Sequence, residues 1–159
     1  MVSVDAKFLV DANVGRLAKW LRVLGYDAEF VGDVEDNEIV RRALKEERII
    51  LTRDTRIMKR GIVASGRIKA LLIVDDDPRA QFRQVVEAFG LRRQSKPFTL
   101  CLECNEPLVA ASSEDVRDQV PAYVFSTQKE YSRCPRCGRI YWKGTHWQRM
   151  TEELDKLQE

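Results

Sequence analysis

IILTRDTRIMKR, residues 49–60, joins a short apolar run to an acid and a group of bases. A continuous apolar run of this length is typical of a strand that is covered on both faces, as the strands of parallel sheets are. Asp54 follows the carboxyl end of that run, and four bases lie around it: Arg53, Arg56, Lys59 and Arg60. The stretch therefore indicates a parallel sheet with a charged site where one of its strands ends.

Three other apolar runs alternate with segments of helical periodicity. The runs are KFLVD (7–11), AEFV (28–31) and ALLIV (70–74). Apolar side chains recur at helical spacing in residues 14–25, 36–47 and 76–90. Strands that alternate with helices in this way predict an α/β fold, in which helices flank a parallel sheet.

Acidic residues follow the predicted strands. Asp11 comes after FLV, Asp54 after IILTR, and Asp75 after LLIV. Because the carboxyl ends of parallel strands meet at one edge of a sheet, these acids would converge there, and Asp36 before the second helix could join them. Carboxylates that are brought together repel one another unless a cation neutralises them. The cluster therefore predicts a hard divalent ion such as Mg²⁺ or Mn²⁺.

Each of these charged residues also has a structural interpretation. An Asp that follows a strand commonly caps the next helix, which would explain Asp36 and Asp77. The bases Arg56, Lys59 and Arg60 are candidate RNA contacts that could hold phosphates, and the alternative is that they form an exposed helix face. Asp11 and Asp54 are the stronger candidates for joint metal or phosphate chemistry, because each continues a buried strand.

Four cysteines form two C-x-x-C pairs, and 29 residues separate the pairs. The cysteines are Cys101, Cys104, Cys134 and Cys137. Two such pairs predict tetrahedral coordination of zinc by four thiolates, as in zinc ribbons. A site with four protein ligands is closed, which indicates a structural Zn²⁺ rather than a catalytic one. The long spacer between the pairs is expected to form an excursion of its own.

The segment after the second cysteine pair combines aromatic and basic residues. Its candidate RNA contacts are Arg139, Tyr141, Trp142, Lys143, His146 and Trp147. Stacking faces and cations together are what single-stranded nucleic acid requires. The alternative is that Tyr141 and Trp142 only cover the small hydrophobic side of the ribbon.

We expect a sheet domain at 1–97, a zinc ribbon at 98–150, and a tail at 151–159 that forms a terminal helix turn or a frayed end.

The composition is that of a folded protein. The 159 residues, 44% of them hydrophobic, suffice for one domain and a small appendage. No run approaches the roughly 18 apolar residues of a membrane span, and the N-terminus lacks the organisation of a secretory signal. We therefore expect a cytoplasmic protein without a membrane partner. A reducing compartment favours metal-bound cysteines over disulfides.

The chain carries four motifs in this order: FLVDANVGRLAKWLRVLGYDAEF, ERIILTRD, CLECNEPL and CPRCGRIYWKGTHWQRM. Together they resemble the Mut-seven C-terminal RNase domain family, over nearly the whole chain. The resemblance implies a PIN-like nuclease fold followed by a zinc ribbon, with Asp11 and Asp54 holding Mg²⁺ or Mn²⁺ to cut RNA. It relates Asp36 to the acid in the loop before the second helix. The sequence departs from the family pattern at Asn13, Val14 and Leu100, and no single residue of the triple acid 75–77 matches a fourth PIN acid.

Two functions follow from these observations. The first is a metal-dependent ribonuclease in which Arg53 stabilises charge on the phosphoryl oxygens and the metal ligands are Asp11, Asp36, Asp54 and Asp75. The second is an RNA-binding or ribonucleoprotein adaptor, in which the basic aromatic ribbon binds RNA and the acids are only caps. A phosphoacceptor receiver domain is disfavoured, because no paired acids follow the first strand and no Lys follows the last apolar strand.

Overall fold

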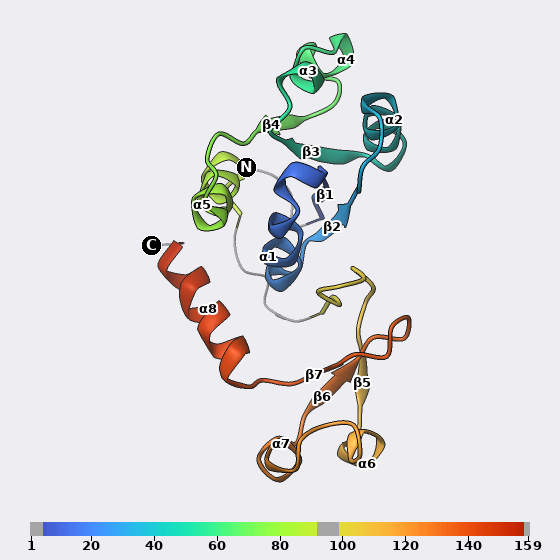
Figure 1. The fold of residues 1–159 in the computed structure, drawn as a ribbon, viewed down its shortest axis with the longest axis vertical. Coiled ribbons are helices and arrows are strands. Elements are labelled where there is room, and N and C mark those ends of the chain that lie inside the picture. Colours follow the sequence, from blue (N-terminus) through green and yellow to red (C-terminus); the bar gives the residue numbers. More distant parts are fainter. Residues whose placement is uncertain (1–4, 92–98, 158–159) are drawn as a thin grey trace.

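The computed structural model describes residues 5–91 and 99–157, so the predicted domain boundary between residues 97 and 98 lies outside the described residues. The larger part of the chain is built on a parallel four-stranded sheet with the order β2-β1-β3-β4 (Figure 1). Its strands are β1 (Lys7–Val10), β2 (Asp27–Phe30), β3 (Arg48–Thr52) and β4 (Ala70–Leu72). Helices flank this sheet, and the predicted α/β fold is therefore confirmed.

The helices form two groups, one on each face of the sheet. One core contains Phe8 of β1 and is covered by α1 (Arg16–Leu24) and α5 (Pro78–Phe89). The other core contains Leu9 and is covered by α2 (Asp36–Glu46), α3 (Thr55–Met58) and α4 (Gly61–Ala64). Neighbouring residues of β1 enter different cores because successive side chains of a strand point to opposite faces. Coverage of both faces explains the continuous apolar runs in the sequence.

The helix ends largely follow capping signals in the sequence. Gly25 ends α1 with a φ of 95°, a left-handed conformation that favours glycine. Asp77 caps α5 by accepting a hydrogen bond from a backbone N–H of the first turn at 3.2 Å. The interpretation of Asp36 as an N-cap is wrong, because Glu35 occupies that position and makes no side-chain cap. Asp36 lies instead in the first turn of α2, where a negative charge is favourable to the helix dipole.

The cysteine-bearing part carries an antiparallel sheet of three short strands. These are β5 (Val109–Ala111), β6 (Tyr131–Arg133) and β7 (Ile140–Tyr141). The spacer between the cysteine pairs forms two short helices, α6 (Ser113–Val116) and α7 (Ala122–Thr127). The buried residues of this part form a small core of Val116, Val124 and Tyr131. A core of this size is one that small domains usually supplement with disulfides or a structural metal.

The last helix, α8 (Thr145–Leu157), crosses the expected boundary at residue 150. Residues 151–157 are helical, as one of the two predicted alternatives has it, but they continue a longer helix and are not a frayed end. Leu154 is completely buried in the core of α1 and α5, and Glu153 pairs with Arg79 of α5 at 2.8 Å. Figure 1 shows α8 leading from the ribbon back towards α5. The helix continues because its apolar side packs on the sheet-bearing part.

The first cysteine loop is docked against the outer edge of β2. The side-chain amide of Asn105 accepts from the backbone N–H of Ala28 at 3.1 Å and donates to the Asp27 carboxylate at 2.6 Å. The buried Arg22 of α1 donates Nε to the Ala28 carbonyl at 2.9 Å and Nη1 to the Leu102 carbonyl at 2.6 Å. Hydrogen bonds between side chains and backbone therefore join the ribbon to the sheet.

Candidate active site and metal centre

The strand order places a topological switch point between β1 and β3. From β1 the chain crosses to β2 on one side, whereas from β3 it crosses to β4 on the other side. In open α/β sheets the carboxyl ends of two such strands form a crevice for ligands. Asp11 directly follows β1, and Asp54 lies two residues after β3. The two acids thus lie where this architecture binds ligands.

One buried hydroxyl connects the two acids. Thr52, the last residue of β3, is completely buried and donates to Asp11 Oδ2 at 2.6 Å. The same hydroxyl oxygen accepts from the backbone N–H of Asp54 at 3.0 Å. Asp11 is only 9% exposed, and its Oδ1 accepts from the backbone N–H of Ala12 at 2.8 Å. The Asp11 carboxylate is therefore held in one orientation beside the backbone of Asp54.

Asp54 is ionised and is partly neutralised by Arg56. Its carboxylate accepts from the Arg56 backbone N–H at 2.8 Å, which caps α3, and from the guanidinium Nη2 at 3.1 Å. These hydrogen bonds from the Arg56 side chain and backbone hold the pKa of Asp54 below its usual range. The contact with Asp54, together with the charge of Asp36, raises the pKa of Arg56. Because the Arg56 side chain is 81% exposed, its ion pair is weak enough for another cation to replace it.

The other bases predicted near Asp54 take different positions. Arg53 forms an ion pair with Asp76, and its backbone N–H donates to Asn13 Oδ1 at 3.2 Å. Lys59 is exposed, and Arg60 donates to an amide side chain of α2. Arg53 is therefore held between the segments that follow β1 and β4, whereas the other two bases lie between α3 and α4.

The predicted acids do not all come together. Asp75 accepts from a backbone N–H two residues further on at 2.9 Å, which stabilises the turn before α5. In the described part of the chain, the four cysteines are the only group of three or more potential metal ligands that converges closely. Asp11 and the backbone of Asp54 are joined through the Thr52 hydroxyl at the switch point. A pair of carboxylates suits a cation that completes its shell with water or phosphate oxygens.

The four cysteines form a group that could hold zinc, and their Sγ atoms all lie within 4.8 Å of one another. The Sγ atoms of Cys101 and Cys137 are 3.7 Å apart. This separation is close to the edge of about 3.8 Å expected for a tetrahedron with Zn–S bonds of about 2.3 Å. Each pair closes with the same turn, because Asn105 N–H donates to the Cys101 carbonyl and Gly138 N–H to the Cys134 carbonyl, both at 2.9 Å. Their geometry and chemistry fit the predicted zinc ribbon.

Tyr141 belongs to this metal centre. Its hydroxyl accepts from the Leu102 N–H and donates to Cys101 Sγ, both at 3.1 Å. Burial tends to raise the pKa of the Cys101 thiol, but hydrogen bonds, that of Tyr141 first among them, lower it to about 7. A thiolate is the form that binds a metal ion. The RNA contact of Tyr141 remains a prediction, and its hydroxyl orients a cysteine of the metal centre.

The other aromatic and basic residues after the second cysteine pair take different positions. Trp142 packs against the small core of the spacer. Lys143 Nζ lies 5.6 Å from the ring centroid of Trp147, a cation–π contact. Arg139 and His146 are exposed. The segment therefore keeps its indole rings partly covered and presents its cations to solvent.

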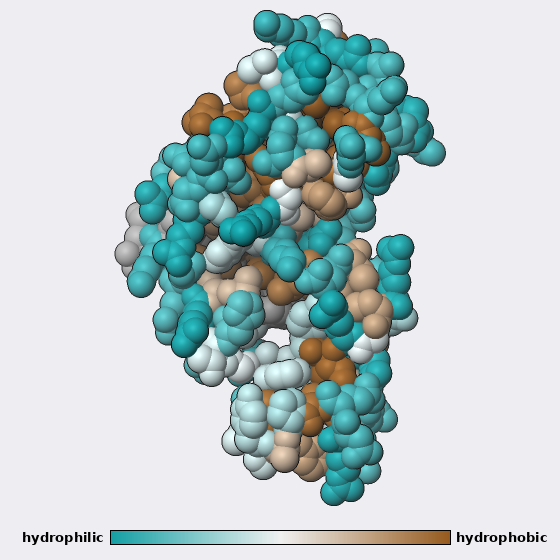
Figure 2. Space-filling view, in the orientation of Figure 1, coloured by the Kyte–Doolittle hydropathy of each residue, from teal (hydrophilic) through white to brown (hydrophobic). Residues whose placement is uncertain are grey.

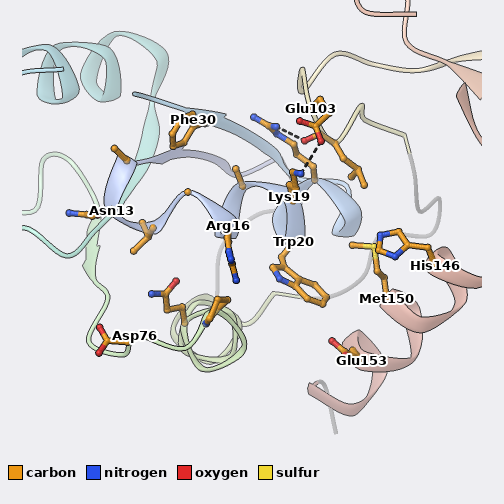
Figure 3. Close-up of a pocket in the computed structure, with 18 of the residues that line it drawn as sticks. Asn13, Arg16, Lys19, Trp20, Phe30, Asp76, Glu103, His146, Met150 and Glu153 are labelled. Atoms are coloured by element: carbon orange, nitrogen blue, oxygen red, sulfur yellow. Dashed lines mark hydrogen bonds and ion pairs between the residues drawn. The ribbon is translucent and has the colours of Figure 1, made fainter. Parts of the chain in front are cut away.

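A groove of about 1080 Å³ runs between α1, α5 and α8 (Figure 3). It begins at Asn13 and Asp76, beside the ends of β1 and β4, and reaches His146 and Arg149 of α8. Figure 3 shows Asn13 at one end and His146 at the other, with the ion pair of Lys19 along one wall. The groove therefore leads from the ribbon side of the molecule to Ala12 and Asn13, the two residues that follow Asp11.

Two smaller hollows of about 470 and 540 Å³ continue the groove along the ribbon. Leu102 and His146 line all three, and Tyr141 and Trp142 line the two on the ribbon. Figure 2 shows a hollow between the sheet-bearing part and the ribbon. The shared lining residues make one path from the ribbon aromatics to the strand ends.

A family model described as the Mut7-C RNase domain matches residues 6–154, nearly the whole chain. The chain belongs to this family. The description of the Mut7-C domain indicates a nuclease-like role on RNA, that of a ribonuclease in general terms. No curated protein and no solved structure matches the chain. Among the helices of residues 5–91 and 99–157, none has the length and apolar character that crossing a membrane demands.

Sequence reasoning missed several residues of the candidate site. Thr52 reads as the end of an apolar strand, and the signal that could have revealed it is a hydroxyl that closes an otherwise aliphatic buried run. Phe30 and Arg16 line the groove, but their positions in the sequence resemble those of ordinary strand and helix residues. Their role depends on α8, which closes the groove from the far end of the chain.

Replacing Thr52 by valine is expected to lower RNA cleavage by the Mut7-C domain about tenfold or more and its unfolding free energy by about 1–3 kcal/mol. Valine keeps the shape and the strand preference, but Asp11 loses a donor and Asp54 N–H loses an acceptor. Initial cleavage rates and urea unfolding measure the two effects. Ser126→Ala, which removes an exposed hydroxyl on α7 outside the groove and its hollows, should change neither. Wild-type activity in Thr52→Val would show that Asp11 needs no orientation by this hydroxyl.

Proposed function

We propose that the protein is a metal-dependent ribonuclease whose reacting centre is the pair Asp11 and Asp54. The observation that supports this most directly is the Thr52 hydroxyl, which donates to the Asp11 carboxylate and accepts from the backbone N–H of Asp54 at the switch point. An oriented carboxylate beside an ionised one has the donor chemistry of hard divalent cations. Mg²⁺ needs only one or two protein carboxylates when waters and substrate phosphates complete its shell.

The donor set fits such an ion. When bound, a divalent ion would lower the pKa of a bound water and offset negative charge on the phosphoryl group. Asp11 and Asp54 would hold the ion, with Asp36 as a further acid. The ion would displace the Arg56 guanidinium from the Asp54 carboxylate. Arg53 would contact a phosphoryl oxygen of the RNA.

Single-stranded RNA would lie in the groove between α1 and α8. The exposed cations Arg16 and Arg149 line this groove and form no ion pair within the described residues. They would bind phosphates, together with His146. The hollows at the ribbon would receive bases beside the partly covered aromatic rings.

A non-catalytic RNA-binding or ribonucleoprotein adaptor is the second candidate, and one observation favours it. Both carboxylate oxygens of Asp11 and of Asp54 already accept hydrogen bonds from the protein, and Asp54 caps α3. In an adaptor these acids would only stabilise the strand ends, while RNA occupied the groove without being cut.

The test is cleavage of end-labelled single-stranded RNA by zinc-loaded protein from which other divalent ions have been dialysed. We expect no cleavage until Mg²⁺ or Mn²⁺ is added, with the zinc content unchanged throughout. The zinc measurement separates an effect at the acids from loss of the ribbon. Cleavage at full rate without added ions would contradict metal dependence. Tight RNA binding without cleavage under either ion would favour the adaptor.

A further inference from the structure

Phe30 is an exposed aromatic side chain beside the candidate active site. It is the last residue of β2, and 46% of its surface is exposed. In the sheet it pairs in register with Val10, the residue before Asp11. The ring lines the groove at the same end as Asn13 (Figure 3). It therefore lies one strand away from an acid of the proposed reacting centre.

The Phe30 ring occupies the space in which a side chain at position 15 would lie, and Gly15 has none. A Cβ atom at position 15 would come within 2.9 Å of Phe30 Cε2, a separation that real contacts essentially never show. The φ of Gly15 is −54°, in the right-handed helical region, so the backbone conformation does not require glycine here. The absence of a side chain at this position thus allows the ring to rest against the backbone before α1.

A cation without a protein partner lines the same groove. Arg16 is exposed and forms no ion pair or hydrogen bond through its side chain within the described residues. Figure 3 shows Arg16 between Asn13 and Trp20, with its side chain pointing away from Phe30. A ring and a guanidinium along one groove suit a single strand of RNA, because the ring can stack on a base and the guanidinium can bind a phosphate further along the strand.

We propose that Phe30 is a stacking platform for one unpaired base of an RNA whose scissile phosphate lies beside Asp11 and Asp54. This inference rests on the proposed function and deepens it by naming the residue that would select unpaired RNA. A base within a duplex is stacked and paired, so it cannot cover the Phe30 ring without first leaving the helix. Phe30 is thus a specificity-determining residue that selects unpaired RNA.

The test measures RNA binding by the full chain carrying Asp54→Asn, which separates binding from cleavage. Single-stranded RNAs carry one 2-aminopurine or one abasic nucleotide at successive positions. We expect one position at which binding quenches the 2-aminopurine fluorescence and an abasic nucleotide weakens affinity about 5- to 150-fold. Adding Phe30→Ala should remove both effects at that position, whereas adding Phe30→Trp should keep them.

Two control variants distinguish a loss of base stacking from a general loss of structure. Leu44 on α2 is 42% exposed and does not line the groove, so Leu44→Ala should bind all RNAs as the parent does. Gly15→Ala should reduce the quenching while Phe30 is present, because its methyl group displaces the ring. In the Phe30→Ala background the same change should have no further effect. Thermal unfolding of every variant verifies that it is folded.

The platform would be overturned if Phe30→Ala weakened binding of single-stranded and duplex RNA equally. It would also be overturned if the quenched position survived Phe30→Ala. Failure of the proposed function has a different signature, namely a quenching that depends on Phe30 in a protein that cuts no RNA with Mg²⁺ or Mn²⁺. That result would support the stacking platform and assign it to an RNA-binding adaptor.

Discussion

Replacing Cys134 by serine is expected to release the zinc ion and unfold the ribbon while the four-stranded sheet stays folded. The three ribbon strands are two or three residues long, and their core is small. In zinc-dependent domains of this size the bound metal supplies about 10–16 kcal/mol, far more than so small a core provides. Zinc content and amide hydrogen exchange measure the result, and we expect the amides of β6 to lose protection while those of β3 keep it.

Arg136→Ser is the matched control for this change. Arg136 lies in the same turn as Cys134, is exposed, and has a distant ion pair with Glu106 at 3.9 Å. The Arg136→Ser variant should keep one zinc ion and wild-type exchange. Zinc retention and full β6 protection in Cys134→Ser would show that three cysteines suffice for the ribbon.

Changing Asp54 to asparagine is expected to reduce RNA cleavage by more than about 100-fold and to leave RNA affinity and folding nearly unchanged. Asparagine caps helices about as well as aspartate, so α3 should keep its first turn. What the change removes is the negative charge that would hold a divalent ion, and charge stabilisation of that kind is worth several kcal/mol in the transition state. Single-turnover cleavage, RNA binding and urea unfolding separate the three quantities.

Asp118→Asn is the control for the loss of one negative charge, because Asp118 is exposed in the spacer far along the chain from the acids. Its cleavage rate should equal that of the wild type. Equal cleavage by Asp54→Asn and wild type would remove Asp54 from the reacting centre. Weaker RNA binding by Asp54→Asn would instead indicate that the acid shapes the groove.

Local signals predicted most of the fold. β3 covers residues 48–52 as its apolar run indicates, and Gly25 ends α1 where the periodicity stops. These features depend on neighbours in the sequence, and so do the two cysteine turns. β4 is shorter than the run 70–74 suggests: Val74 lies beyond it, 73% exposed.

The parts that sequence could not supply depend on contacts between distant segments. Asn105 accepts from the N–H of Ala28 across 77 positions, and Arg22 donates to Leu102 across 80. No sequence pattern predicts either hydrogen bond, because the position in which the ribbon docks on the sheet determines which residues meet. The groove has the same origin, since α8 must return to the sheet-bearing part to form its wall. For this reason the acids could be listed from sequence, whereas their orientation by Thr52 could not.

The docked cysteine loop also protects the sheet from self-association. β2 is an outer strand, and a bare outer strand offers its N–H and C=O groups to a strand of another chain. At Ala28 both groups are already occupied, the N–H by Asn105 and the carbonyl by Arg22. A fragment that stopped before residue 99 would lose Asn105 and expose this edge to aggregation. The ribbon is thus a cover for the sheet as well as a neighbour of the groove.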